Sequence, residues 1–197
     1  FQQSLFATAQ VGYKESAYID LTARNDWSST LSHTKHEGRG YFYPSVGTSL
    51  ILSRLLTLPE WVSYAKVRAA YSMVGNDIPL YITNSASHIT AGGEYLANDA
   101  APFKEMEPEM NYSWEIGAEG LFLNSRITFY RTNTHNQFFK LPTLAGDKYA
   151  YRYVNAGNIQ NQGWEIALDA TPVMAKDFMW STTLNFASNR NKIVALH

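Results

Sequence analysis

The 197-residue chain contains no cysteine, which excludes disulfide bonds, thiolate nucleophiles and cysteine-ligated metals. It is also poor in charge, with 17% Asp, Glu, Lys and Arg and a formal net charge of -1. Such a chain lacks the overall basic field that binding to nucleic acid uses. Nothing in it approaches the ~18 consecutive apolar residues of a transmembrane helix. These absences argue against a thiol enzyme, a nucleic-acid binder and a helical membrane protein.

Signatures of catalysis are missing as well. The sequence has no Walker-type loop, no G-x-G-x-x-G and no G-x-S-x-G. Of the histidines, only His33 and His36 lie close together, in a polar loop without an acidic partner at metal-site spacing. The acidic run Glu105, Glu107 and Glu109 is interpreted as an exposed loop, with a cation held by oxygen ligands as the alternative. We therefore expect no catalytic residue, no cofactor and no metal site, and we do not expect an enzyme.

Aromatic residues, in contrast, are abundant: 13 Tyr, 10 Phe and 5 Trp make up 14% of the chain. Amphipathic rings of this kind gather at membrane interfaces. They also line the surfaces of carbohydrate-binding β-sandwiches. Composition alone does not separate these two classes.

Apolar and polar residues alternate with a period of two, which indicates β-strands and not helices. In the first segment Leu5, Ala7, Ala9 and Val11 share one face and Gln10 lies on the other. Eight strands are predicted in this way, most of them close to the ten residues that a tilted strand needs to cross a bilayer. They span residues 5–13, 18–24, 42–53, 65–74, 114–122, 127–134, 164–170 and 180–186.

The connections between these strands alternate strictly between short and long. Short ones are predicted at 14–17, 54–64, 124–126 and 172–177, and long ones at 25–40, 75–111, 136–161 and after 189. Within the second short connection, residues 55–62 break the alternation and predict a helical turn. Outer-membrane barrels have short periplasmic turns and long outer loops, so this order favours an antiparallel transmembrane β-barrel over a soluble sandwich.

Charged residues fall on the faces opposite the apolar ones. In a barrel they line a polar lumen, whereas in a sandwich they face solvent. The residues concerned are Asp20, Arg24, Lys66, Arg68, Glu115, Glu119, Glu165 and Asp169.

Several segments resemble the SusC/RagA family of TonB-dependent outer-membrane transporters. The first is YIDLTARNDWSSTL at residues 18–31, which is similar to the family's strand-to-loop signature. It is followed in family order by YFYPSV at 41–46, KVRAAYSMVGND at 66–77, SWEIG at 113–117, and VNAGNI and NQGWE at 154–159 and 161–165. The last segment has Gln162 where the family usually has lysine. The departures concentrate in the long loops.

The resemblance implies an all-β, plugged barrel of roughly 22 strands, of which residues 1–197 supply about eight as part of the barrel domain. Because the chain starts at Phe1 inside a strand pattern, we expect it to be a piece of the C-terminal half; the family's plug domain and TonB box are not in this sequence. The function implied is nutrient import across the bacterial outer membrane. The implied substrate is an oligosaccharide or a peptide. The implied partners are outer-membrane lipid, a SusD-like surface lipoprotein and the TonB–ExbB–ExbD complex acting on the plug.

Substrate contact is expected from the outer loops and the outer rim of the lumen. The candidates lie where strands enter the long loops, and we expect most of them to hold the loop exits in place. They are Arg24, Asn25, Asp26, Trp27, Asn76 and Asp77.

Two alternatives stay open at this point. The first is a soluble β-sandwich that binds carbohydrate, in which the apolar strand faces would cover one internal core. The second is a passive outer-membrane channel, or a scaffold for surface lipoproteins, without coupling to TonB.

Overall fold

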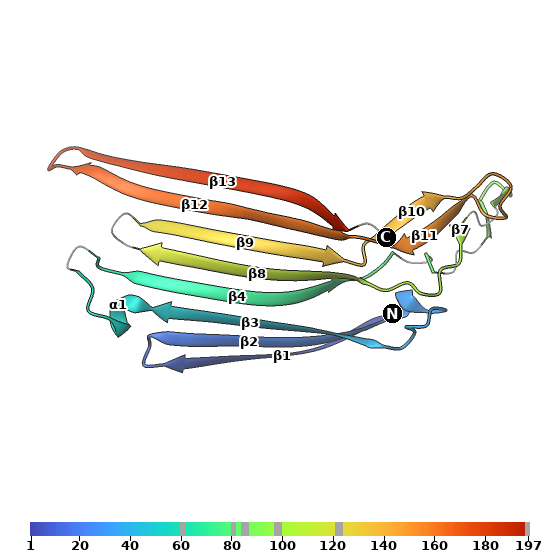
Figure 1. Cartoon of the computed structure of the whole chain (residues 1–197), viewed down its shortest axis with the longest axis horizontal. Coiled ribbons are helices and arrows are strands. Elements are labelled where there is room, and N and C mark those ends of the chain that lie inside the picture. The colour runs from blue at the N-terminus through green and yellow to red at the C-terminus, as the bar shows by residue number, and fades with distance from the viewer. Residues whose placement is uncertain (60–61, 80–81, 84–86, 97–99, 121–123, 196–197) are drawn as a thin grey trace.

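A computed structural model describes residues 1–59, 62–79, 82–83, 87–96, 100–120 and 124–195 of the chain. Its main feature is one eight-stranded antiparallel sheet (Figure 1). The sheet is ordered β1-β2-β3-β4-β8-β9-β12-β13, so that each strand pairs with the next long strand of the chain. These strands are β1 (Gln2–Tyr13), β2 (Ala17–Ser28), β3 (Gly40–Ile51), β4 (Ala65–Asn76), β8 (Glu109–Gly120), β9 (Ser125–His135), β12 (Asn158–Met174) and β13 (Met179–Ala195).

All short connections lie at one end of the sheet and all long ones at the other (Figure 1). The β1–β2 turn closes through a bond from Ser16 N to Tyr13 O, with Lys14 and Glu15 both at positive φ. The long loops carry small elements of their own. These are the 3-10 helix η1 (Ser29–Leu31), the pair β5 (His88–Ile89) and β6 (Tyr95–Leu96), and a small sheet of β7 (Ala100–Ala101), β10 (Phe138–Pro142) and β11 (Tyr151–Asn155).

The eight predicted strands are confirmed, but several run further than predicted. The strand expected to end at Arg24 continues to Ser28, because Asp26 pairs with Ser4 of β1 and Tyr41 of β3. Likewise β12 begins at Asn158 and β13 reaches Ala195, inside segments that were expected to be loops. Ladder bonds to two neighbours, or to one long partner, outweigh the local preference of Asn and Asp for turns. The predicted end of the fifth strand, residues 121–122, lies outside the described residues.

The helical turn expected over residues 55–62 is shifted. The helix α1 spans Leu52–Leu55, and Leu56 N donates to Leu52 O at 2.9 Å. Residue 58 precedes Pro59, and a residue before proline is disfavoured in helical conformation. A helix could therefore not continue through residue 58 toward 62; residues 60–61 lie outside the described part.

The apolar face of the sheet is open. Ile19 is 47% exposed, Ile116 55% and Leu184 60%, and the register places them on the same side of the sheet. Within the described residues the buried apolar cluster lies instead among the long loops and consists of Leu31, Ile78, Ile82 and Met106. A soluble sandwich would bury the strand faces in its core, so this prediction of the sandwich alternative is wrong. An exposed apolar face of this extent marks a surface that meets another apolar medium.

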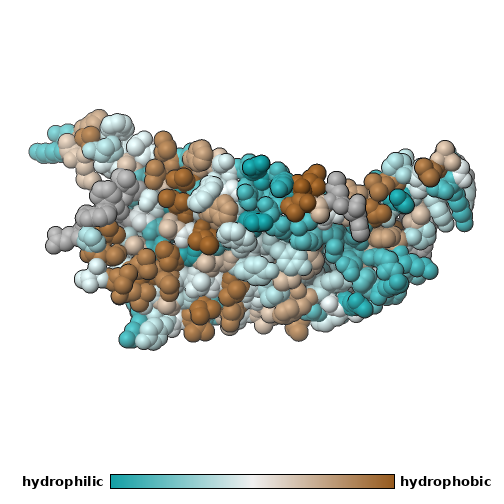
Figure 2. Space-filling model, in the orientation of Figure 1, coloured by the Kyte–Doolittle hydropathy of each residue, from teal (hydrophilic) through white to brown (hydrophobic). Residues whose placement is uncertain are grey.

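The distribution along the strands is uneven too. On the face visible in Figure 2, hydrophobic residues gather over the half of the sheet near the short turns, and hydrophilic ones over the half near the long loops. None of the described helices is long and apolar enough to cross a membrane.

Candidate functional site

The polar face carries a connected set of ion pairs at the centre of the sheet. Arg68 on β4 lies between two carboxylates of β8, with Nη2 at 2.7 Å from Glu115 Oε1 and Nε at 3.9 Å from Glu119 Oε1. Arg126 on β9 approaches Glu119 at 3.5 Å. Arg68 Nη2 also donates to Thr128 Oγ1 at 3.1 Å. The three strands β4, β8 and β9 therefore form a wall that is held in register by charges on one side.

Other members of the predicted lumen set are held by neutral partners. Gln10 donates to Asp20 at 2.6 Å across the β1–β2 pair, and Thr183 donates to Asp169 at 2.7 Å across the β12–β13 pair. Because the pairs lie on the same side of the sheet as Arg68, the polar face forms a wall that carries paired polar side chains from β1 to β13.

Two glycines make room for large side chains on this wall. Arg68 lies directly opposite Gly117 in the register, and a Cβ at Gly117 would be 2.9 Å from Arg68 Nε. A Cβ at Gly163 would be 2.6 Å from the hydroxyl of Tyr130 and would also meet the backbone oxygen of Ser188. These are the glycines of the SWEIG and NQGWE segments. Each motif thus has glycine where a larger residue would clash with a side chain of the neighbouring strand.

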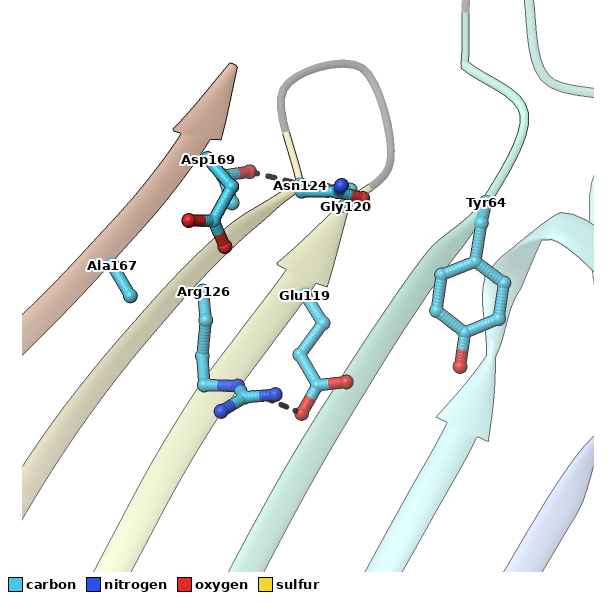
Figure 3. Close-up of a pocket in the computed structure, with 8 residues that line it drawn as sticks. Tyr64, Glu119, Gly120, Asn124, Arg126, Ala167 and Asp169 are labelled. Atoms are coloured by element: carbon cyan, nitrogen blue, oxygen red, sulfur yellow. Dashed lines mark hydrogen bonds and ion pairs between the residues drawn. The ribbon is translucent and has the colours of Figure 1, made fainter. Parts of the chain in front are cut away.

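A cavity of about 310 Å³ opens on the polar face near the short turns. Figure 3 shows Glu119 and Arg126 pointing toward each other across β8 and β9, with Asp169 on the neighbouring strand and Tyr64 on the far side. Gly120, Asn124, Ser125 and Ala167 complete the lining. The cavity lies at the end of the sheet away from the predicted substrate residues.

The predicted outer-rim residues fall into two groups. Arg24 and Asp26 lie on the polar face of β2, where Arg24 Nε donates to Asp26 Oδ1 at 2.7 Å and Nη2 donates to Ser4 Oγ at 3.1 Å. Asn25 and Trp27 lie on the opposite, outward face of the same strand. There they flank Gly40 of β3, at which a Cβ would be 2.8 Å from Trp27 Nε1. The strand pleat therefore separates residues that are adjacent in the motif.

Asp77, directly after β4, ties the first long loop to the rim. It accepts hydrogen bonds from Ser28 Oγ at 2.5 Å, from the hydroxyl of Thr30, and from its neighbour Ile78 N at 2.9 Å. Asn76 is the last residue of β4 and is exposed. Asp77 thus holds a loop exit, the role expected for most of this set.

Sequence reasoning missed the residues that surround Asp26 and Asp77. Tyr41 and Tyr43 of β3, together with Ser28, line a cavity of only about 20 Å³ between these carboxylates. Space of that size holds a water molecule at most. The rim residues therefore contact one another and leave no room for a substrate between them. The YFY segment at residues 41–43 was recognisable in the sequence. That its tyrosines lie beside Asp26 is known only from the register of β3 against β2.

The second and third long loops are joined through one side chain that the motif analysis did not single out. Asn155, in the VNAGNI segment, donates through Nδ2 to the backbone oxygens of Glu107 (2.9 Å) and Asn136 (2.7 Å), and its Oδ1 accepts from Glu107 N (2.8 Å). Asn136 in turn donates to the Glu107 carboxylate at 2.8 Å. The first loop joins through His36, whose Nε2 lies 3.3 Å from Glu107. The outer loops thus form one connected cap.

The acidic run considered as a cation site is occupied by these partners. Glu107 contacts His36 and Asn136, Glu105 pairs with Lys35, and Glu109 lies on β8. Nowhere among the residues described do three His, Asp or Glu side chains gather into a group that could hold a metal ion.

With this geometry in view, comparison with known proteins decides the family. The model of the family described as "TonB dependent receptor-like, beta-barrel" matches residues 1–193. The chain belongs to this family. The matched segment contains seven of the eight long strands whole and β13 as far as residue 193, so the predicted barrel sheet is confirmed; with the relative SusC described next, the resemblance of the motifs is confirmed as well.

Curated relatives of the family point the same way. TonB-dependent receptor P26 of Formosa agariphila is 28% identical over 98% of this chain, which covers 20% of that relative. TonB-dependent receptor SusC of Bacteroides thetaiotaomicron is 28% identical over 89% of this chain and 19% of its own length. The chain thus spans about a fifth of the curated relatives that it matches.

Solved structures of the family share the fold. The RagAB peptide importer in its closed-closed state superposes with a TM-score of 0.82 at 22% identity, over 99% of this chain and 22% of that one. The siderophore receptor PirA from Pseudomonas aeruginosa gives a TM-score of 0.64 at 18% identity, over 98% and 35%. The family's members are receptors of the bacterial outer membrane, so the open apolar face of this TonB-dependent receptor segment faces lipid and its polar face lines the lumen.

Proposed function

We propose that this chain is part of the barrel domain of a SusC/RagA-type importer that takes up oligosaccharides or peptides across the outer membrane. One observation carries the proposal. The sheet has a polar face opposite its lipid-facing one, and the outer loops at one end of the sheet join into a connected cap. The likeness to SusC and to the RagAB importer over nearly the whole chain supports it. The plug domain would be supplied by another part of the complete protein.

Import of this kind needs no covalent chemistry in the barrel wall. The wall keeps a hydrated, charged surface, on which Arg68 and Arg126 balance the charges of Glu115 and Glu119. A neutral substrate such as an oligosaccharide, or a zwitterionic peptide, meets paired charges at this part of the wall. Movement would be driven by a difference in affinity between two states of the whole transporter, as any ligand-coupled change requires.

Each end of the wall suits a different partner. At the outer end, hydrogen bonds of Asn155 and Asp77 hold the long loops together. A SusD-like lipoprotein would bind to the surface that these loops form. At the inner end, the cavity with Glu119, Arg126 and Asp169 would receive polar groups of the plug, on which the TonB–ExbB–ExbD complex would act. Of the six rim candidates, Arg24, Asp26, Asn76 and Asp77 remain proposed substrate-facing residues; Asn25 and Trp27 lie on the outward face or its rim.

Uptake measurements in cells test the proposal. The complete gene that encodes this chain is deleted, and uptake of labelled oligosaccharides and of labelled peptides is compared with that of a complemented strain, each with and without TonB. The proposal expects uptake of one substrate class to need both this gene and TonB. Uptake that needs the gene but is unchanged without TonB would favour the passive channel. Unchanged uptake of both classes in the deletion strain would refute import.

A further inference from the structure

We propose that the outward face of β9, β12 and β13 binds the phosphate groups of outer-leaflet lipid, of the phosphorylated lipid A type, through Arg131, Arg190 and Lys192. The site lies on the lipid side of the wall, apart from the lumen and the loop cap. It therefore does not rest on the import function.

The depth of these cations is set by an aromatic belt. On the outward face, the rings of Trp114 and Phe129 have centroids 5.1 Å apart, and those of Phe129 and Trp164 are 4.8 Å apart. Adjacent Trp and Phe rings across three strands are typical of the girdle at a membrane interface. The register continues the Phe129–Trp164 row onto Ser188 of β13.

The cations occupy the two rows on the loop side of the Phe129–Trp164 row, and Trp114 of the belt lies in the first of them, opposite Arg131. Arg131, Gln162 and Arg190 are cross-strand neighbours in the first row. Gln160 and Lys192 follow in the second. Each row is about 7 Å further along a strand, or about 5 Å in depth for a strand tilted by about 40°. Head groups occupy roughly the 5–8 Å outside the hydrocarbon, so the first row lies at head-group depth and the second row, with Lys192, just outside it.

Within the described structure these cations also lack the carboxylate partners that the inward arginines have. Arg68 and Arg126 both form ion pairs on the polar face. Among the described residues, no Asp or Glu lies within 4 Å of Arg131, Arg190 or Lys192. The outward positions of β9, β12 and β13 beyond the belt carry no acidic residue either. Their charge is left for an anion from outside the chain.

The side-chain chemistry favours phosphate. With the Gln160 amide oriented to satisfy both groups, Arg131 Nε donates to its oxygen at 2.8 Å, which orients the guanidinium without neutralising it. Arginine forks bind phosphate oxygens in bidentate fashion, and a nearby lysine adds charge. The same outward face carries the aromatic belt and, toward the short turns, apolar side chains that face lipid. A phosphate attached to an acyl chain therefore fits this face better than a soluble phosphate.

Thermal stabilisation of the complete protein in detergent tests the site. The transporter is titrated with bis-phosphorylated lipid A, with the same lipid stripped of its phosphates, and with inorganic phosphate. We expect saturable stabilisation by the phosphorylated lipid alone. The concentration for half-maximal effect should rise about fivefold for each cation removed, in R131Q, in R190Q/K192Q and in the triple variant. The matched control K140Q/K148Q/R152Q removes the same charge from an outer loop and should behave as wild type.

Barrel folding is checked separately by the heat-dependent gel shift of each variant, and R131Q alone keeps the test open if a multiple variant does not fold. Equal stabilisation by the dephosphorylated lipid would overturn the proposal, because phosphate would then not be what is recognised. Equal response to inorganic phosphate would overturn the assignment to lipid. An unchanged titration in the triple variant would refute these residues as the site.

Discussion

Arg68 lies flat over Gly117, its strand neighbour, and this contact allows its guanidinium to reach Glu115 at 2.7 Å and Thr128 at 3.1 Å. A side chain at position 117 would occupy the space of the Arg68 stem. The glycine is thus part of the ion-pair network although it carries no charge.

Gly117→Ala is expected to lower the stability of the folded barrel by about 1 kcal/mol, because Arg68 must move and the backbone oxygen of Ile127 lies 3.3 Å from the new methyl group. Urea unfolding of the complete protein in detergent measures the loss. The matched control is Gly47→Ala, also on the polar face, where a Cβ would meet Asp20 Cβ at an ordinary 3.7 Å. Equal midpoints for the two variants would contradict the packing role of Gly117.

Asp77→Asn should loosen the first long loop. The carboxylate accepts from Ser28, Thr30 and Ile78, and an amide offers one acceptor oxygen in place of two, so a loss of about 1 kcal/mol in local stability is expected. Hydrogen exchange over residues 29–39 reports it.

Asp147→Asn is the control for that measurement, since Asp147 is exposed in another long loop and its carboxylate makes no hydrogen bond or ion pair in the described structure. If exchange over residues 29–39 rises equally in both variants, the anchoring role of Asp77 is wrong.

Asn155→Ala is expected to separate the second long loop from the third. Three hydrogen bonds end on this one side chain, and loss of buried bonding groups costs about 1–3 kcal/mol. Limited proteolysis should then cut residues 136–157 faster, while the barrel itself stays folded. Asn185→Ala, on β13, removes an exposed amide without a partner in the described structure and should leave cleavage unchanged. Unaltered cleavage in Asn155→Ala would show that the cap is held by other contacts.

The alternation of lipid and lumen along β12 is open to direct labelling, which the absence of cysteine from this chain simplifies. Single cysteines at Ile166, Ala167 and Leu168 are placed in the complete protein, freed of any other cysteine, and reconstituted in bilayers. A water-soluble maleimide should modify the cysteine at 167 readily and those at 166 and 168 slowly, because the pleat turns the latter two to hydrocarbon. In denaturant all three should react alike. Fast reaction at 166 and 168 in the bilayer would reverse the assignment of the two faces.

Most of the sheet could be predicted because the signal is local: alternation within a strand and the length of each connection are properties of consecutive residues. The predicted strands β12 and β13 were too short at the end where their outward face becomes polar, on the loop side of the aromatic belt. Gln160, Gln162 and Arg190 do not continue the apolar pattern. They remain in strands because β12 and β13 pair with each other along this stretch. Their conformation is set by neighbours distant in sequence.

The site was predictable only in part for the same reason. Asp77 was singled out from the sequence as a rim candidate, but its partners Ser28 and Thr30 are 49 and 47 residues away. Asn155 was part of a recognised motif, but its role appears only when three loops converge on Glu107. The separation of Asn25 and Trp27 from Arg24 and Asp26 required knowing that β2 continues past the expected end.

The sequence by itself determined the class of this protein: period-two alternation with low charge and no long apolar run dictates strands that face two media, and the motif order names the family. The tertiary structure decided which charges neutralise one another, which glycines exist to accommodate a neighbour, and how the outer loops join. Those relations depend on register between strands, and register is a property of pairs that no single stretch of chain contains.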